Sequence, residues 1–127
     1  MRGMQVLLVE DEPANLRAIG RLLQAAGHHV TLASDGLQAF AAIERGGLEA
    51  VVCDIRMPSL GGVGFFEQLE ERYPNIAART VFVTAFADEP PVRAFLEQTG
   101  QPFFGKPFLP AELLASVTDI GRQQSAQ

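Results

Sequence analysis

Short apolar runs alternate along this chain of 127 residues with longer segments of helical periodicity. Several runs are rich in β-branched or aromatic residues and end directly in a polar or breaker residue, as at 6–9, 51–53, 81–83 and 103–104. Such runs are typical of strands buried on both faces, and strands of that kind belong to parallel sheets. The alternation therefore predicts an α/β fold with a parallel sheet, right-handed crossovers and helices on both faces.

The periodicities predict five strand-then-helix units within one domain over residues 1–127. The first helix shows the pattern clearly, because Leu16, Ile19 and Leu23 recur on one face and Pro13 suits its first turn. The strands are predicted at 5–9, 29–33, 50–54, 80–84 and 102–105, and the helices at 13–26, 36–45, 63–72, 90–98 and 110–123.

Polar residues that follow the strands carry the candidate chemistry. Glu10 and Asp11 follow the first strand, and Asp54 ends the third; Thr84 ends the fourth, and Lys106 follows the fifth. The carboxyl ends of parallel strands meet at one edge of the sheet, where ligands bind in this class of fold. Three carboxylates brought together there repel one another unless a cation lies among them, and Mg²⁺ prefers carboxylate oxygens.

Each of these residues alone has an ordinary explanation. An acidic pair usually starts a solvated helix, Thr84 is a common strand residue, and a loop lysine such as Lys106 is usually solvated. Asp54 is less ordinary, because a buried aspartate is rare unless paired and a carboxylate can form an aspartyl phosphate. Together, these residue types at the ends of successive strands favour a site for phosphoryl transfer.

Composition limits the partners and the location. The net charge of −5 disfavours nucleic acid and anionic membrane surfaces as main partners. The apolar runs are far shorter than a membrane span, so we expect no membrane contact. The chain leads directly into the first predicted strand, without a signal-peptide pattern, and its one cysteine cannot form an internal disulfide. These features favour a cytoplasmic location.

An ordered set of motifs covers nearly the whole chain: Val-Leu-Leu-Val-Glu-Asp-Glu-Pro at 6–13, Asp-Ile-Arg-Met-Pro at 54–58, Val-Thr-Ala-Phe at 83–86 and Lys-Pro-Phe at 106–108. In these motifs the chain resembles the receiver domains of bacterial two-component response regulators. The resemblance implies a flavodoxin-like, doubly wound fold with a five-stranded parallel sheet of order 2-1-3-4-5. The segments 100–108 and 109–114 are similar to receivers attached to sensor kinases, which suggests an origin in a hybrid sensor kinase.

The resemblance also implies a metal site and a phosphorylation site. It makes Asp54 the phosphorylated residue and Asp11 the main ligand of a Mg²⁺ or Mn²⁺ ion, which Asp54 also binds. Arg56 would contribute its backbone carbonyl, and Glu10 would bind the metal through a water molecule. Thr84 and Lys106 would hold the phosphoryl oxygens.

Two further features follow from the same resemblance. Phe103 occupies the position of the family's aromatic switch residue, although ordinary strand packing explains a phenylalanine there equally well. The peptide bond between Lys106 and Pro107 is expected to be cis.

The resemblance implies a phosphoacceptor that assists its own phosphorylation and dephosphorylation, and not a conventional enzyme. The phosphoryl donor would be a histidine kinase or a histidine phosphotransfer domain. Phosphorylation would shift the face formed by 90–98, 102–105 and 110–123. With no basic patch for nucleic acid, the next partner would be another protein or another receiver, including a second copy of this chain as a homodimer.

Other functions remain open at this point. A phosphatase of the haloacid dehalogenase type needs a second aspartate two residues after Asp54, where this chain has Arg56. A flavin-binding module would place a phosphate beside residues 10–12, which are all acidic. A receiver could also serve as a docking module without phosphorylation, or as a phosphate sink. His28 and His29 lie where the second predicted strand begins and are expected to be loop residues, not ligands.

Overall fold

The computed structural model describes residues 3–55 and 61–125. The strands are β1 (Gln5–Val9), β2 (His29–Ala33), β3 (Ala50–Asp54), β4 (Thr80–Thr84) and β5 (Phe103–Gly105). The helices are α1 (Pro13–Ala25), α2 (Gly36–Glu44), α3 (Gly61–Arg72), α4 (Pro74–Ala77), α5 (Pro90–Thr99) and α6 (Pro110–Ser125).

The sheet has the order β2-β1-β3-β4-β5, and every neighbouring pair is parallel. This confirms the fold that the motifs implied. The order changes direction at β1, which lies between β2 and β3. In an open α/β sheet, such a reversal leaves a crevice outside the carboxyl ends of the strands.

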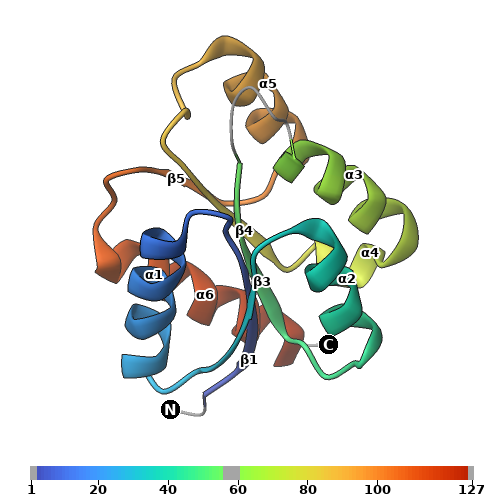
Figure 1. Ribbon diagram of the computed structural model, residues 1–127, viewed down its shortest axis with the longest axis vertical. Coiled ribbons are helices and arrows are strands. Elements are labelled where there is room, and N and C mark those ends of the chain that lie inside the picture. Colours follow the sequence, from blue (N-terminus) through green and yellow to red (C-terminus); the bar gives the residue numbers. More distant parts are fainter. Residues whose placement is uncertain (1–2, 56–60, 126–127) are drawn as a thin grey trace.

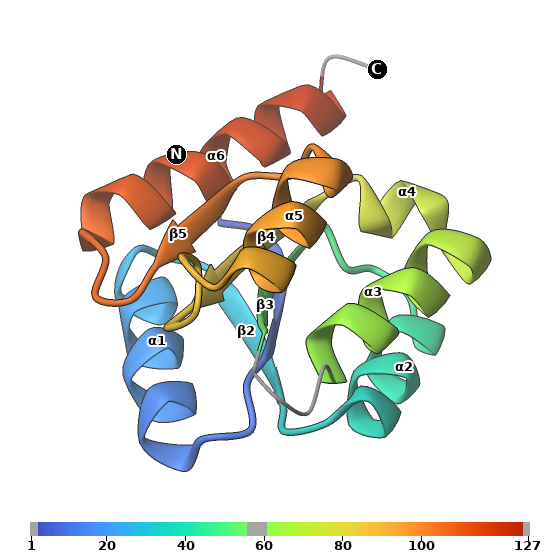
Figure 2. The same cartoon turned by 90° about the horizontal axis from the view of Figure 1, so that it is seen from above.

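Helices cover both faces of the sheet (Figures 1 and 2): α1 and α6 lie on one face, and α2, α3, α4 and α5 on the other. Successive side chains of a strand point to opposite faces. In β1, Leu8 packs into the core under α1 and α6, whereas Leu7 packs under the other helices. Both are fully buried, which explains why the strands read as continuous apolar runs.

The helix ends follow local sequence signals. Pro13 lies in the first turn of α1, and the Glu12 carboxylate caps that helix by accepting a hydrogen bond from the Ala14 amide at 2.7 Å. Gly27, just after the end of α1, has a φ of 97°, a conformation that glycine adopts without strain. Prolines also begin α5 and α6.

The structure differs from the sequence predictions in a few places. Helix α4 was not predicted, because it has only four residues and no repeat of an apolar face. Strand β5 begins at Phe103, one residue later than predicted, although the Pro102 carbonyl still accepts a hydrogen bond from the Phe82 amide at 2.9 Å. Helix α3 begins two residues earlier than predicted, and α6 ends two residues later.

A buried histidine lies where β1 and β2 begin. His28 lies in the connection before β2, as expected, but it is buried, and its Nδ1 accepts a hydrogen bond from the Met4 amide at 3.1 Å. His29 begins β2 itself, so the loop prediction is wrong for that residue.

Among the described residues, no helix is both long and apolar enough to cross a membrane.

Candidate functional site

Acidic side chains gather at the carboxyl ends of β1 and β3. Val9 pairs with Cys53 in the sheet, so the next residues, Glu10 and Asp54, lie side by side where β1 and β3 end. Asp11 joins them: one carboxylate oxygen from each of Glu10, Asp11 and Asp54 lies within 4.8 Å of the others. The sequence predicted this meeting of carboxylates.

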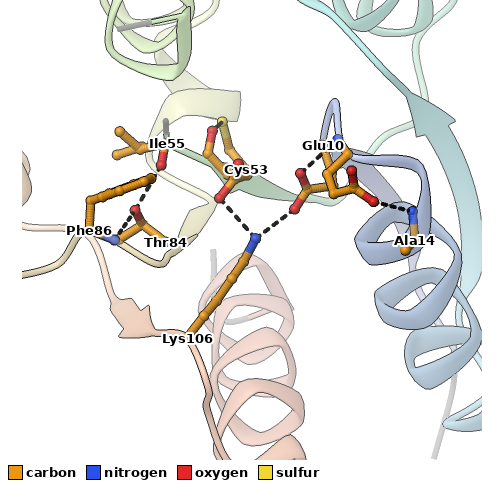
Figure 3. A network of polar contacts seen from close by, with 9 residues as sticks. Glu10, Ala14, Cys53, Ile55, Thr84, Phe86 and Lys106 are labelled. Carbon is orange, nitrogen blue, oxygen red and sulfur yellow. Dashed lines mark hydrogen bonds and ion pairs between the residues drawn. The ribbon is translucent and has the colours of Figure 1, made fainter. Parts of the chain in front are cut away.

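Lys106 reaches this cluster from the end of β5 (Figure 3). Its Nζ donates a hydrogen bond to Glu10 Oε1 at 2.7 Å and forms an ion pair with Asp54 Oδ1 at 3.1 Å. The other oxygen of Glu10 accepts a hydrogen bond from the Glu12 amide at 3.1 Å, and the Glu10 side chain is fully buried. Glu10 is therefore held directly by Lys106, a contact that the motifs did not predict.

The charges of the cluster perturb one another. Burial raises the pKa of Asp54 to about 6, with a further contribution from the charge of Glu10, while Lys106 acts in the opposite direction. Burial alone would lower the pKa of Lys106, but its hydrogen bond to Glu10 and the charge of Asp54 raise it overall. The ammonium thus stays charged, and it does not fully offset the cost of ionising Asp54.

Thr84 ends β4 beside this cluster and is fully buried. Its hydroxyl donates a hydrogen bond to the Ile55 carbonyl at 2.7 Å and accepts one from the Phe86 amide at 3.0 Å (Figure 3). A hydroxyl has one proton to donate. The hydroxyl therefore uses its proton on the Ile55 carbonyl and its oxygen on the Phe86 amide.

Two other predicted features lie close by. Phe103 is partly buried against the core under α2, α3 and α5, and the guanidinium of Arg93 lies 5.1 Å from the centre of its ring. The Lys106–Pro107 peptide bond is cis, as the resemblance implied. Arg56, the expected carbonyl ligand, lies outside the described residues.

The donor atoms fit a small hard cation. The cluster offers carboxylate oxygens from three residues, and those oxygens are close enough to share one ion. Mg²⁺ and Mn²⁺ take such ligands and complete their coordination with water. Burial is the main cause of the raised pKa of Asp54, and the charges of Glu10 and Asp11 add to it. A divalent ion would relieve that repulsion among the carboxylates.

Comparison with known proteins identifies the family. The family model described as the response regulator receiver domain matches residues 6–118. The chain belongs to this family. Its members act in two-component signalling, and this receiver carries the acidic cluster and the lysine at the switch point of the sheet.

Curated relatives include both sensor proteins and regulators. The receiver is 31% identical over 122 residues to the sensory/regulatory protein RpfC of Xanthomonas campestris pv. campestris (strain 8004), covering 94% of this chain and 17% of RpfC. It is also 31% identical over 121 residues to the transcriptional regulatory protein TcrA of Mycobacterium tuberculosis (strain ATCC 25618 / H37Rv), covering 95% of this chain and 47% of TcrA. The chain thus spans less than half the length of either relative.

Solved structures agree with the fold. The receiver domain of the sensor histidine kinase PA1611 from Pseudomonas aeruginosa PAO1, which has a magnesium ion coordinated in its active site cleft, is 33% identical with a TM-score of 0.79. The match covers 94% of this chain and 98% of that domain. A CheY-like receiver domain protein from Methanospirillum hungatei JF-1 is 23% identical with a TM-score of 0.83, covering 98% and 99% of the two chains.

Sequence reasoning missed several groups around the site. The Ile55 carbonyl and the Phe86 amide bind Thr84, and Arg93 contacts Phe103. The first two are backbone atoms, which every residue carries, so no motif reveals them. Arg93 lies on the predicted helix at 90–98, and Phe103 lies on the strand that follows. No sequence periodicity predicts a contact between residues of two different elements.

Proposed function

We propose that residues 1–127 form one receiver domain that accepts a phosphoryl group on Asp54 from a phosphohistidine, with the help of Mg²⁺ or Mn²⁺. The main support for this proposal is the set of groups around Asp54. Lys106 Nζ lies 3.1 Å from Asp54 Oδ1, and the carboxylates of Asp11 and Glu10 lie within 4.8 Å. This arrangement provides a nucleophile, a fixed positive charge and a metal site at one place.

The chemistry is a direct transfer. An oxygen of the Asp54 carboxylate forms a bond to phosphorus, while the bond from phosphorus to the donor's imidazole nitrogen breaks and leaves neutral imidazole after protonation. Lys106 neutralises a phosphoryl oxygen, and the Thr84 hydroxyl donates to another. Transfer of the phosphoryl group from Asp54 to water returns the carboxylate, so the domain assists its own dephosphorylation without acting on a separate substrate.

Asp11 and Asp54 would hold the metal ion directly, with the Arg56 carbonyl as a further ligand and Glu10 bound through water. When bound, the ion supplies positive charge to the acidic cluster and to the phosphoryl oxygens. Lys106 contacts Glu10 before phosphorylation. We infer that its ammonium turns from Glu10 towards the phosphoryl group when one is present.

The partners follow from this role. The donor is a histidine kinase or a histidine phosphotransfer domain in the cytoplasm, and relatives such as RpfC and the sensor kinase CckA of Brucella abortus (strain 2308) favour an origin in a hybrid kinase. The signal leaves through the face formed by α5, β5 and α6. The partner that takes up the signal is another protein, and a second copy of this chain is among the candidates. Nucleic acid is not, since the net charge is −5.

Labelling with a small phosphodonor tests the proposal. Acetyl phosphate with Mg²⁺ should give the protein an acid-stable, hydroxylamine-labile phosphate, and removal of the metal by EDTA should abolish it. Asp54→Asn keeps the shape of the side chain and should prevent labelling. Equal labelling of Asp54→Asn would refute the role of Asp54. An unlabelled native protein would favour a docking module, and turnover of a generic phosphoester would favour a phosphatase.

A further inference from the structure

Arg93, near the start of α5, joins the loop after β4 to strand β5 through a single side chain. Its Nε donates a hydrogen bond to the Ala87 carbonyl at 3.0 Å, and its Nη2 forms an ion pair with Asp88 Oδ1 at 3.2 Å. The same guanidinium lies over the Phe103 ring, 5.1 Å from its centre. No motif marked this residue, and the proposed phosphoryl chemistry does not use it.

The loop that Arg93 holds, residues 85–88, follows Thr84 directly. The Phe86 amide donates to the Thr84 hydroxyl at 3.0 Å, and the Phe86 carbonyl accepts a hydrogen bond from the Glu89 amide at 3.0 Å. Arg93 adds its bond to Ala87 in the same loop. The position of Thr84 and the conformation of this loop are therefore connected by hydrogen bonds.

Thr84 cannot serve a phosphoryl group without a rearrangement. Its one hydroxyl proton lies on the bond to the Ile55 carbonyl, at 2.7 Å (Figure 3). To donate to a phosphoryl oxygen, the hydroxyl must release Ile55. The same oxygen accepts from Phe86, so its movement changes the loop as well. Any contact that fixes the loop adds to the cost of this step.

We propose that Arg93 is a positioning residue that stabilises the arrangement of the 85–88 loop and of Phe103 in which Thr84 is bound to Ile55, and so opposes phosphoryl binding. The inference rests on the proposed function, because it concerns the equilibrium that the phosphoryl group shifts. Asp88 is fully exposed, so its ion pair with Arg93 contributes little in water. The bond to Ala87 and the contact with Phe103 are the main restraints.

The affinity for beryllofluoride, a mimic of the phosphoryl group, measures this restraint. With Mg²⁺ present, Arg93→Ala should bind beryllofluoride about three- to tenfold more tightly than the native protein. That change corresponds to part of the stabilisation that one cation–π contact and one hydrogen bond provide. Arg93→Lys should lie between the two, since an ammonium can lie over the ring but cannot reproduce the Nε bond to Ala87.

Arg72 supplies a matched control. Arg72 ends α3, and its guanidinium lies 4.5 Å from the centre of the Phe40 ring and 5.5 Å from that of Tyr73, neither of which belongs to the 85–88 loop or to β5. Arg72→Ala therefore removes a contact of the same kind and should leave the beryllofluoride affinity unchanged. Both alanine variants lose some thermal stability, so stability alone does not distinguish them, whereas the affinity does.

A second measurement uses the protein without metal or beryllofluoride. In NMR spectra of phenylalanine-labelled protein, the Phe103 ring signals of Arg93→Ala should move towards their position in the beryllofluoride-bound native protein. Unchanged or weaker beryllofluoride binding by Arg93→Ala, or an equal effect of Arg72→Ala, would overturn the role of Arg93 alone. A native protein that does not bind beryllofluoride at all would overturn the proposed function, and this inference with it.

Discussion

Lys106 lies closer to Glu10 than to Asp54 in this receiver: its Nζ is 2.7 Å from Glu10 Oε1 and 3.1 Å from Asp54 Oδ1. The ammonium thus lies between a buried carboxylate that anchors it and the carboxylate proposed to be phosphorylated. It also lies beside the position proposed for the metal ion, where two positive charges would repel each other.

This relationship predicts the effect of removing the lysine. Lys106→Met keeps most of the length of the side chain and removes its charge, so Mg²⁺ should bind the metal-free protein about three- to tenfold more tightly, because the competing cation is gone. The same variant should still fold but should no longer respond to beryllofluoride. Calorimetric titration with Mg²⁺ measures the first effect, and Arg45→Met, at an exposed arginine, is the control. Weaker Mg²⁺ binding by Lys106→Met would contradict this account.

The native response can be followed directly, because Lys106 is the only lysine in the chain. Protein labelled with ¹³C at the lysine ε carbon should give a single side-chain signal. That signal should shift when Mg²⁺ and beryllofluoride are added, as the ammonium leaves Glu10. A signal that stays in place on adding beryllofluoride would mean that Lys106 does not contact the phosphoryl group.

The metal site should control stability. Mg²⁺ relieves repulsion among Glu10, Asp11 and Asp54, so it should raise the unfolding temperature, with about 2.7 kcal/mol gained at a hundredfold excess over its dissociation constant. Asp11→Ala should weaken Mg²⁺ binding at least about tenfold, as expected when one ligand of a hard cation is lost. Asp88→Ala, at an exposed acidic residue of the 85–88 loop, should leave the affinity unchanged. Equal Mg²⁺ affinity in Asp11→Ala and the native protein would exclude Asp11 as a ligand.

Asp54 should make the metal-free protein less stable as the pH rises. Its pKa in the folded state is about 6, above the value of about 3.9 expected in the unfolded chain. The folded state therefore holds the proton more tightly, and about 2 kcal/mol of stability is lost as the pH rises from about 4 through 6. Urea unfolding in EDTA should show this slope in the native protein and a flatter profile in Asp54→Asn. An equal slope in both proteins would assign the effect to other groups.

His28 should act in the opposite direction. Burial lowers its pKa, and its Nδ1 accepts the Met4 amide proton, a bond that a protonated imidazole cannot accept. The folded state thus favours the neutral form, and its contribution is lost as the pH falls below about 6.5, the pKa of an unperturbed histidine. In the Asp54→Asn background, which removes the opposing slope, His28→Gln should reduce the loss of stability between pH 7 and pH 5.5. His29→Gln, at an exposed neighbour, should not.

The sequence predicted the sheet well because its evidence lies in composition and order along the chain. Four of the five strands were placed to the residue, since runs such as 51–53 are buried on both faces and bounded by polar residues. The meeting of Asp11 and Asp54 followed from the strand order that the family resemblance implied. Helix α4 was missed, because four residues are too few to show a period.

The finer arrangement of the site could not be predicted from the sequence. Which carboxylate Lys106 prefers depends on distances of a few tenths of an ångström, and both partners fit the motif. The bond from Thr84 to the Ile55 carbonyl depends on the path of the backbone after β3. The contact of Arg93 with Phe103 depends on how α5 packs against β5. Such choices are made by packing and not by residue type.

The position of the phosphoryl group tests the central claim most directly. After reaction with acetyl phosphate and Mg²⁺, borohydride reduces an aspartyl phosphate to homoserine, which tandem mass spectrometry can locate. Trypsin cleaves after Arg45 and Arg56 and releases the peptide 46–56, whose only acidic residues are Glu49 and Asp54. The account predicts homoserine at position 54 of this peptide, dependent on Mg²⁺. Homoserine at Asp11, or at any position other than 54, would contradict it.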